Sequence, residues 1–245
     1  TFIFCAENNW ISEVIIFAEQ AVKAIKDGGE VDFDDRIINL LPEKAKCVFN
    51  KLKGLNLFKA TIKKFENSET YNLTIEQNND CKDGVDGCTD GKDIANGNIK
   101  INLRITPHEQ PLNFAAALLH EGIHAELFKY VDEYQKGLDP NKRKNLLGWY
   151  FIYKGYDSQS EHAQHQHMAD NYVKPIAEAI RKLDNYSYPL EYYMGFGWDG
   201  LRKYGYDEYY DNGKLVSLDK SEASEYNIKQ KIVNDNTKLN GNECK

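Results

Sequence analysis

Two histidines and a glutamate lie close together in residues 120–124, which read HEGIH. His120 and His124 are four residues apart, so on a helix their imidazoles lie one turn apart on one face and can bind a single ion. Zinc held by three protein ligands keeps one position open for water, lowers the pKa of that water and polarises a carbonyl bound beside it. Glu121 lies next to such an ion and can take the proton of the water. The segment therefore predicts metal-assisted amide hydrolysis, with Glu121 as general base and Nε2 of both histidines as metal ligands.

The HExxH spacing is specific. In a chain with six histidines, it arises by chance in roughly one sequence in a hundred of this composition. The alternative is a pair of polar residues on a helix flank that bind no metal. We disfavour it, because two histidines on a surface rich in Ala, Leu and Ile would carry unpaired imidazole nitrogens into the core.

A third metal ligand must come from another part of the chain. The extended pattern of the metzincin subclass would require a histidine six residues after His124, where Tyr130 stands, so this subclass is excluded. Residues 161–170 read EHAQHQHMAD and supply five candidate ligands, which are Glu161, His162, His165, His167 and Asp170.

Among these candidates we favour His165, because on a helix it lies on the apolar stripe and points inward. His162 lies one turn earlier on nearly the same face and is the second choice, followed by Glu161. His167 points elsewhere, and we expect it on the surface or behind the ligands. The predicted metal ligands are thus His120, His124 and His165.

The predicted reaction also needs a hydrogen-bond donor for the oxyanion of the tetrahedral intermediate, usually Tyr, His or Arg. The tyrosines after the second histidine cluster are the candidates, namely Tyr172, Tyr186, Tyr188, Tyr192 and Tyr193. Each of them could equally be a core residue. We interpret His108, which precedes the first cluster, as a solvated loop residue.

Hydrophobic periodicity predicts the elements that position these residues. Helical spacing of apolar residues predicts helices over residues 11–26, 42–53, 57–66, 111–130 and 160–183, the last with a kink at Pro175. Alternating apolar residues predict half-buried strands over residues 71–75 and 98–105. The second strand directly precedes the helix that carries HEGIH. The region 186–210 is expected to be irregular and packed.

A loop rich in Asp and Gly is predicted over residues 78–97. Its carboxylates could bind calcium, and they come from Asp80, Asp83, Asp86 and Asp90. Their spacing does not fit the EF-hand pattern, which also ends in a glutamate that this loop lacks. We favour a plain solvated turn over a calcium site.

Charge and composition bear on the partners and location that we expect for the protein. The net charge of −7 comes from acidic and basic residues spread along the chain, so we expect no nucleic-acid partner. The chain lacks a long apolar stretch, so we expect no membrane segment. It begins at Thr1 rather than Met, which is compatible with a removed leader or upstream domain.

The cysteines fit neither a zinc ribbon nor a dense disulfide scaffold, because their number is five and none forms a CxxC pair. Cys81 and Cys88 flank the Asp/Gly-rich loop, and the sequence leaves open whether they pair. Cys47 lies in a helical pattern and is interpreted as a small core residue.

The segment INLRITPHEQPLNFAAALLHEGIHAELF resembles the edge strand and active-site helix of zincin metallopeptidases. Three further segments, CVFNKLKG, HQHMADNY and MGFGWDGL, are similar to parts of poorly characterised bacterial zincin-like domains of secreted or toxin-like proteins. The resemblance spans residues 41–205. It implies a helix-rich α+β fold, and we match His165 to the histidine that precedes a Met-Ala pair in that group. It also implies that the strand at 98–105 binds an extended substrate by strand addition.

We therefore expect a single zincin-like domain over residues 1–245, α+β and rich in helix, with a small sheet before the active-site helix. Its parts are an N-terminal helical part (1–67), a catalytic part (68–210) and a polar tail (211–245) that covers the surface or frays. The leading hypothesis is a secreted or extracellular bacterial zinc peptidase, a toxin or effector, acting on protein or peptide substrates. The alternatives are an inactive zinc-binding interaction module and a zinc amidase acting on a non-peptide amide.

Overall fold

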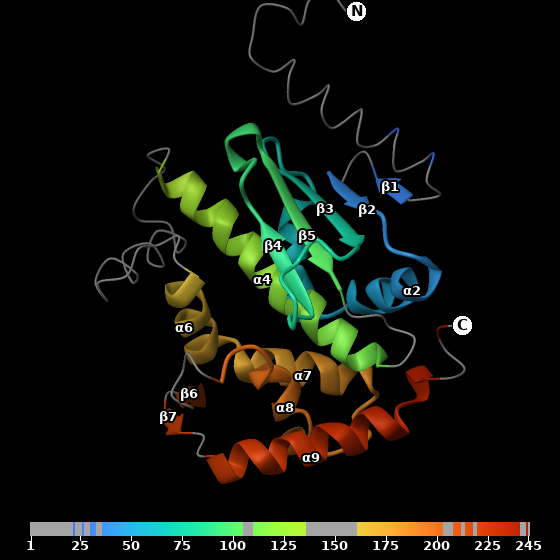
Figure 1. Cartoon of the computed structure of the whole chain (residues 1–245), viewed down its shortest axis with the longest axis vertical. Helices are drawn as coiled ribbons and strands as arrows, with labels where there is room; N and C mark the ends of the chain where they lie inside the picture. Colours follow the sequence, from blue (N-terminus) through green and yellow to red (C-terminus); the bar gives the residue numbers. More distant parts are fainter. Residues whose placement is uncertain are drawn as a thin grey trace, which may run out of the picture.

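The computed structural model describes Val22, Lys26 and residues 30–32, 36–104, 110–135, 161–202, 208–211, 214–217, 220–240 and 244 (Figure 1). The predicted helix at 11–26 lies outside these residues except for Val22 and Lys26. His108 and the last residue of the predicted strand at 98–105 also lie outside them. The described residues form a fold of mixed α and β structure, as expected.

A small sheet forms one side of the molecule. Its strands follow the order β1 (Glu30–Asp32), β2 (Ile37–Asn39), β3 (Asn72–Gln77), β5 (Asn98–Leu103) and β4 (Gly87–Asp90). The three inner strands are parallel to one another, while β1 and β4 run antiparallel to their neighbours. Both predicted strands are present, but β3 is buried from Asn72 to Ile75 rather than on alternate residues. Inner strands of a parallel sheet are buried on both faces, which removes the alternation.

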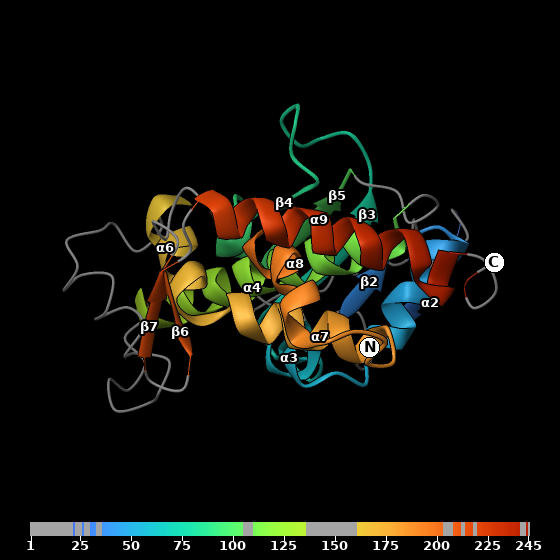
Figure 2. The same cartoon turned by 90° about the horizontal axis from the view of Figure 1, so that it is seen from below.

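Helix α4 (Pro111–Gln135) lies between this sheet and the C-terminal helices (Figures 1 and 2). Pro111 occupies the first helical position, where its missing N–H costs nothing. The helix contacts β4 and β5 on one side and α7 (Val173–Leu183), α8 (Met194–Trp198) and α9 (Lys220–Asn236) on the other. Because α4 is covered on several sides, residues such as Phe114, Leu118 and Leu127 are buried all round it.

Two short strands that the sequence does not predict, β1 and β2, fall inside the N-terminal part. Strands of three residues are too short to show an alternating pattern. Helix α2 (Glu43–Leu52) matches the prediction. The helix predicted at 57–66 is instead divided into α3 (Asn56–Ala60) and the 3-10 helix η1 (Ile62–Phe65). The break occurs at Thr61, whose hydroxyl donates to the carbonyl of Leu57.

The helix predicted at 160–183 is also divided, into α6 (Glu161–Asn171) and α7. The break is at Tyr172, three residues before Pro175, which has no N–H to continue the bonding of α6. The packed region that follows contains η3 (Leu190–Tyr192) and α8, whose five residues are all buried. A hairpin of β6 (Glu208–Asp211) and β7 (Lys214–Ser217) comes next.

The tail, predicted to be polar and to cover the surface or fray, forms helices in the part that the structure describes. The tail contributes α9 and η4 (Lys238–Asn240), and it places Val233 and Leu239 in the core. Its end is joined to α2 by a Cys47–Cys244 disulfide. The sequence pattern hides this packing, because α9 carries few apolar residues and Ile228 among them is exposed.

Two disulfides occur among the described cysteines. Cys81 and Cys88 pair across the Asp/Gly-rich loop, which settles the question that the sequence left open. Cys47 is a partner of Cys244 rather than a small free core residue. Among the helices that the structure describes, none has the length and apolar character needed to cross a membrane.

Candidate metal centre

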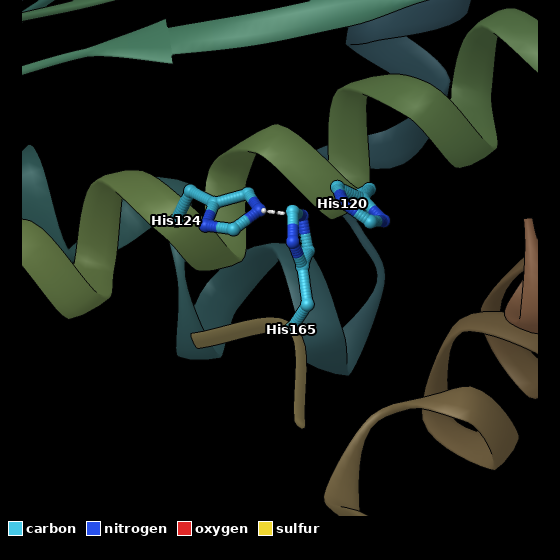
Figure 3. A group of neighbouring side chains, drawn as sticks. All are labelled: His120, His124 and His165. Atoms are coloured by element: carbon cyan, nitrogen blue, oxygen red, sulfur yellow. Dashed lines mark hydrogen bonds between the residues drawn. The ribbon is translucent and has the colours of Figure 1, made fainter. Parts of the chain in front are cut away.

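Three histidines lie close together, two of them on α4 and one on α6 (Figure 3). His120 and His124 lie one turn apart, with ring centroids separated by 5.1 Å. His165 of α6 lies 5.5 Å from His120 and 4.6 Å from His124, again between ring centroids. One ligand atom of each residue lies within 4.8 Å of the others. The structure thus brings together the three predicted ligands, and they could hold a metal ion.

The geometry of the donors suits an ion held by imidazoles. Nε2 of His124 and Nε2 of His165 are 2.9 Å apart. Two nitrogens at zinc–nitrogen distances of about 2.0–2.1 Å and a tetrahedral angle are separated by about 3.3 Å, so a small shift would bring this pair to the spacing that the ion requires. Imidazole suits zinc, copper, iron and nickel.

The environment keeps His120 uncharged. Burial lowers the pKa of His120 well below its usual value, and the neighbouring imidazoles of His124 and His165 lower it further. A neutral imidazole is the form that binds a metal. His120 is therefore ready to act as a ligand at neutral pH.

Glu121 and the three histidines line one cavity of about 1120 Å³. Glu121 is buried, and its Oε2 accepts a hydrogen bond of 2.8 Å from the hydroxyl of Thr89 on β4. The same hydroxyl lies 2.9 Å from the backbone carbonyl of Glu121. A Cβ at Gly87 would lie 3.0 Å from Cγ of Glu121, so the glycine lets β4 approach the carboxylate closely. Thus β4 positions the predicted base.

The segment after α8 supports His120 from the other side. Gly200 has a φ of +76°, and a Cβ there would lie 3.2 Å from Cε1 of His120. Asp199 and Arg202 of the same segment line the cavity. Burial raises the pKa of Asp199, Asp86 raises it further, and Arg202 opposes the shift.

The other predicted ligands do not join the cluster or cannot be placed. The side chains of Glu161 and His162 lie outside the described residues. His167 is not in the cluster: its ring packs against that of Tyr172 at 5.8 Å between centroids. Burial lowers the pKa of His167 to about 4.

No tyrosine that the structure describes lines the cavity. The Tyr193 hydroxyl donates to Asp184 at 2.6 Å, and the rings of Tyr188 and Tyr192 stack on each other. These tyrosines are packing residues rather than oxyanion donors. The cavity instead contains cationic side chains, which are Lys82, Lys92, Lys100 and Arg202.

The Asp/Gly-rich loop is more ordered than predicted, because β4 lies within it. Its aspartates do not gather into a group that could hold a cation, as judged over the described residues. Asp83 pairs with Arg104 at 2.7 Å, and Asp90 pairs with Lys92 at 3.3 Å. The loop forms a wall of the cavity instead.

Strand addition at residues 98–105 is contradicted by the order of the sheet. Residues 98–103 form β5, whose backbone is paired with β3 on one side and β4 on the other. The edge strand beside the cavity is β4, and all four of its residues line the cavity.

Three contacts of the site were missed by sequence reasoning, and they involve Thr89, Gln164 and Gly200. Each residue contacts a site residue that is distant in the chain. None is of a type that usually binds a metal or transfers a proton. The side-chain oxygen Oε1 of Gln164 accepts a hydrogen bond from Nδ1 of His124 at 2.7 Å. Only its place next to His165 could have drawn attention to it.

The comparisons with known proteins add no relative. No protein-family model, no curated protein and no solved structure matches this chain.

Proposed function

We propose that this chain is a zinc-dependent metallopeptidase in which His120, His124 and His165 hold the ion and Glu121 is the general base. The observation that carries the proposal is the convergence of three imidazoles in the cavity that also contains the Glu121 carboxylate. Three neutral histidines leave a bound ion its full positive charge and an open position for water. When bound, zinc would supply the Lewis acid that activates water and polarises the scissile carbonyl.

The chain's own residues would handle the protons. Glu121 would take a proton from the attacking water and later deliver it to the leaving amine nitrogen. Thr89 would hold the carboxylate towards the cavity through its 2.8 Å hydrogen bond. The site needs no Ser or Cys nucleophile, and both described disulfide pairs remove cysteines from such a role.

An extended peptide is the substrate that best fits the cavity. Strand β4 is an edge strand that lines it, and edge strands present backbone N–H and C=O groups to which a peptide can add as a further strand. The strand also carries Thr89, so a peptide along β4 would pass close to Glu121.

Two disulfides support a secreted or extracellular location, because disulfides persist in oxidising compartments. The origin from a bacterium and a role as toxin or effector stay predictions from the sequence resemblance.

The test compares the wild type with Glu121→Gln. We expect both to bind one equivalent of zinc, while cleavage of casein falls by about 10²–10⁴-fold in the variant, the range for loss of an acid–base group. Glu126→Gln is the matched control. Glu126 lies on the same helix and is also buried, but it pairs with Lys64 and does not line the cavity.

Other outcomes would replace the proposal. Zinc binding without hydrolysis of any peptide in a broad library would favour an interaction module. Hydrolysis of small non-peptide amides alone would favour an amidase. Equal casein cleavage by the wild type and Glu121→Gln would remove Glu121 from the mechanism.

A further inference from the structure

Gln164 contacts a predicted metal ligand on another helix. It lies on α6 next to His165, it is 2% exposed, and its Oε1 is 2.7 Å from Nδ1 of His124. The opposite edge of the same ring points to the cluster, because Nε2 of His124 lies 2.9 Å from Nε2 of His165. The imidazole of His124 is therefore held at both nitrogens by neighbouring residues of α6.

The orientation of the Gln164 amide decides which ring nitrogen of His124 carries the proton. A neutral imidazole has one N–H, and its other nitrogen has the lone pair that can bind a metal. When the amide oxygen faces Nδ1, the proton is on Nδ1 and the lone pair is on Nε2. If the amide NH₂ faced Nδ1 instead, the proton would be on Nε2 and would block the ligand atom.

We propose that Gln164 is a positioning residue that holds His124 in the Nδ1–H tautomer, so that Nε2 is prepared to bind the metal. The part of the inference that concerns metal affinity rests on the proposed zinc site. The part that concerns the tautomer does not, because it follows from the amide oxygen that faces Nδ1. Partners of this kind orient metal-binding histidines and fix their tautomer in many sites.

The same contacts assign a different role to His165. If Nε2 of His124 has the lone pair, the 2.9 Å contact requires His165 to donate from its own Nε2. His165 must then move its proton to Nδ1 before its Nε2 can bind the ion. His124 keeps its tautomer when the metal binds, whereas His165 changes tautomer.

The first experiment reads the tautomers directly. Imidazole ¹⁵N chemical shifts of the full chain are recorded after chelator treatment and again with one equivalent of zinc. We expect His124 as Nδ1–H in both states and His165 as Nε2–H only without zinc. An Nε2–H tautomer of His124 in the chelator-treated wild type would overturn the proposal.

Two variants separate positioning from packing. Gln164→Met has a similar length but no hydrogen-bonding amide, whereas Gln164→Glu retains an oxygen acceptor. We expect Gln164→Met to show a mixture of His124 tautomers and a zinc affinity lower by about 10–100-fold. Gln164→Glu should keep the Nδ1–H tautomer and an affinity at least equal to that of the wild type. Zinc affinity is measured by competition with a chromophoric chelator.

The two proposals fail in different ways. If Gln164→Met keeps both the wild-type tautomer and the wild-type affinity, Gln164 is only a packing residue and the inference is wrong. If the wild type binds no zinc although Gln164→Met changes the His124 tautomer, the positioning role stands and the proposed function fails. Should Gln164→Met not fold by circular dichroism, the wild-type shifts and Gln164→Glu still decide the matter.

Discussion

Helices α4 and α6 both provide ligands to the candidate metal centre, but they are embedded in the protein to different extents. Helix α4 lies between the sheet and the C-terminal helices, and nearly every side chain around His120 and His124 is buried. On α6, the buried side chains among those described are Gln164, Met168 and Ala169. The pair of ligands on α4 is fixed by core packing, whereas the third ligand depends on the docking of a shorter and more exposed helix.

This difference has a consequence for metal binding. Three contacts that α6 makes at the site involve polar groups or the ion itself: Gln164 with His124, His165 with His124, and His165 with the ion in the proposed zinc form. Binding of an ion should therefore stabilise α6 more visibly than α4, which is already held by apolar burial.

The largest effect is expected from removing ligands. His124→Ala should abolish binding of one zinc equivalent, because it removes both a ligand and the partner of Gln164. His165→Ala should weaken binding by on the order of a hundredfold and leave the His120–His124 pair as a weak site. Chelator competition measures both. Equal affinities for the wild type and His165→Ala would show that α6 provides no ligand.

The next effect concerns the dynamics of α6. Hydrogen exchange of the chelator-treated protein should be faster in α6 than in the centre of α4. Zinc at one hundred times its dissociation constant stabilises the bound form by about 2.7 kcal/mol, so exchange in α6 should slow by about a hundredfold. His165→Ala should remove this protection. If the zinc-free protein shows equal hydrogen-exchange protection in α6 and α4, the proposed difference between the two helices is wrong.

Acid should weaken the fold through His167 of α6. Its pKa is about 4 in the folded protein and near 6.5 when unfolded, so below pH 6.5 the unfolded state binds the proton first. The contribution of neutral His167 to the stability of the fold is therefore present above pH 6.5 and is lost as the pH falls towards 4. Between pH 7 and 5 the free energy of unfolding should fall by at most about 2 kcal/mol from this residue. Urea denaturation of wild type and His167→Asn checks this, and an equal loss in both would remove His167 as the cause.

The smallest effect is expected at Gly200, which supports the α4 side of the site. Gly200→Ala should cost about 1 kcal/mol of stability for a left-handed backbone and also lower zinc affinity severalfold by crowding His120. Gly84→Ala is the matched control, because Gly84 has a φ of +83° but open space around it. Thermal denaturation and zinc titration separate the two effects. A zinc affinity lowered equally in both variants would contradict the contact.

The sequence predicted the part of the site that depends on local pattern. The spacing of His120 and His124 and the apolar surroundings of α4 are local, and so is the face of α6 on which His165 lies. These features follow from the geometry of a single helix. Both inner strands that were predicted, β3 and β5, are also long enough to show their pattern.

The remaining features depend on contacts between distant residues. The Cys47–Cys244 disulfide joins residues 197 positions apart, and nothing in either local sequence specifies the pairing. Gln164 and Gly200 acquire a role only because α6 and the segment after α8 meet α4. The edge position of β4 depends on the strand order of the sheet, which a four-residue strand does not reveal.

A zinc-edge anomalous difference map of crystals grown with one equivalent of zinc tests the central claim most directly. We expect one peak in the cavity, at about 2.0–2.1 Å from one nitrogen of each of His120, His124 and His165. The ligand atom of His124 should be Nε2, with the amide of Gln164 at Nδ1. A peak elsewhere, or a zinc ion that leaves out either α4 or α6, would contradict the account.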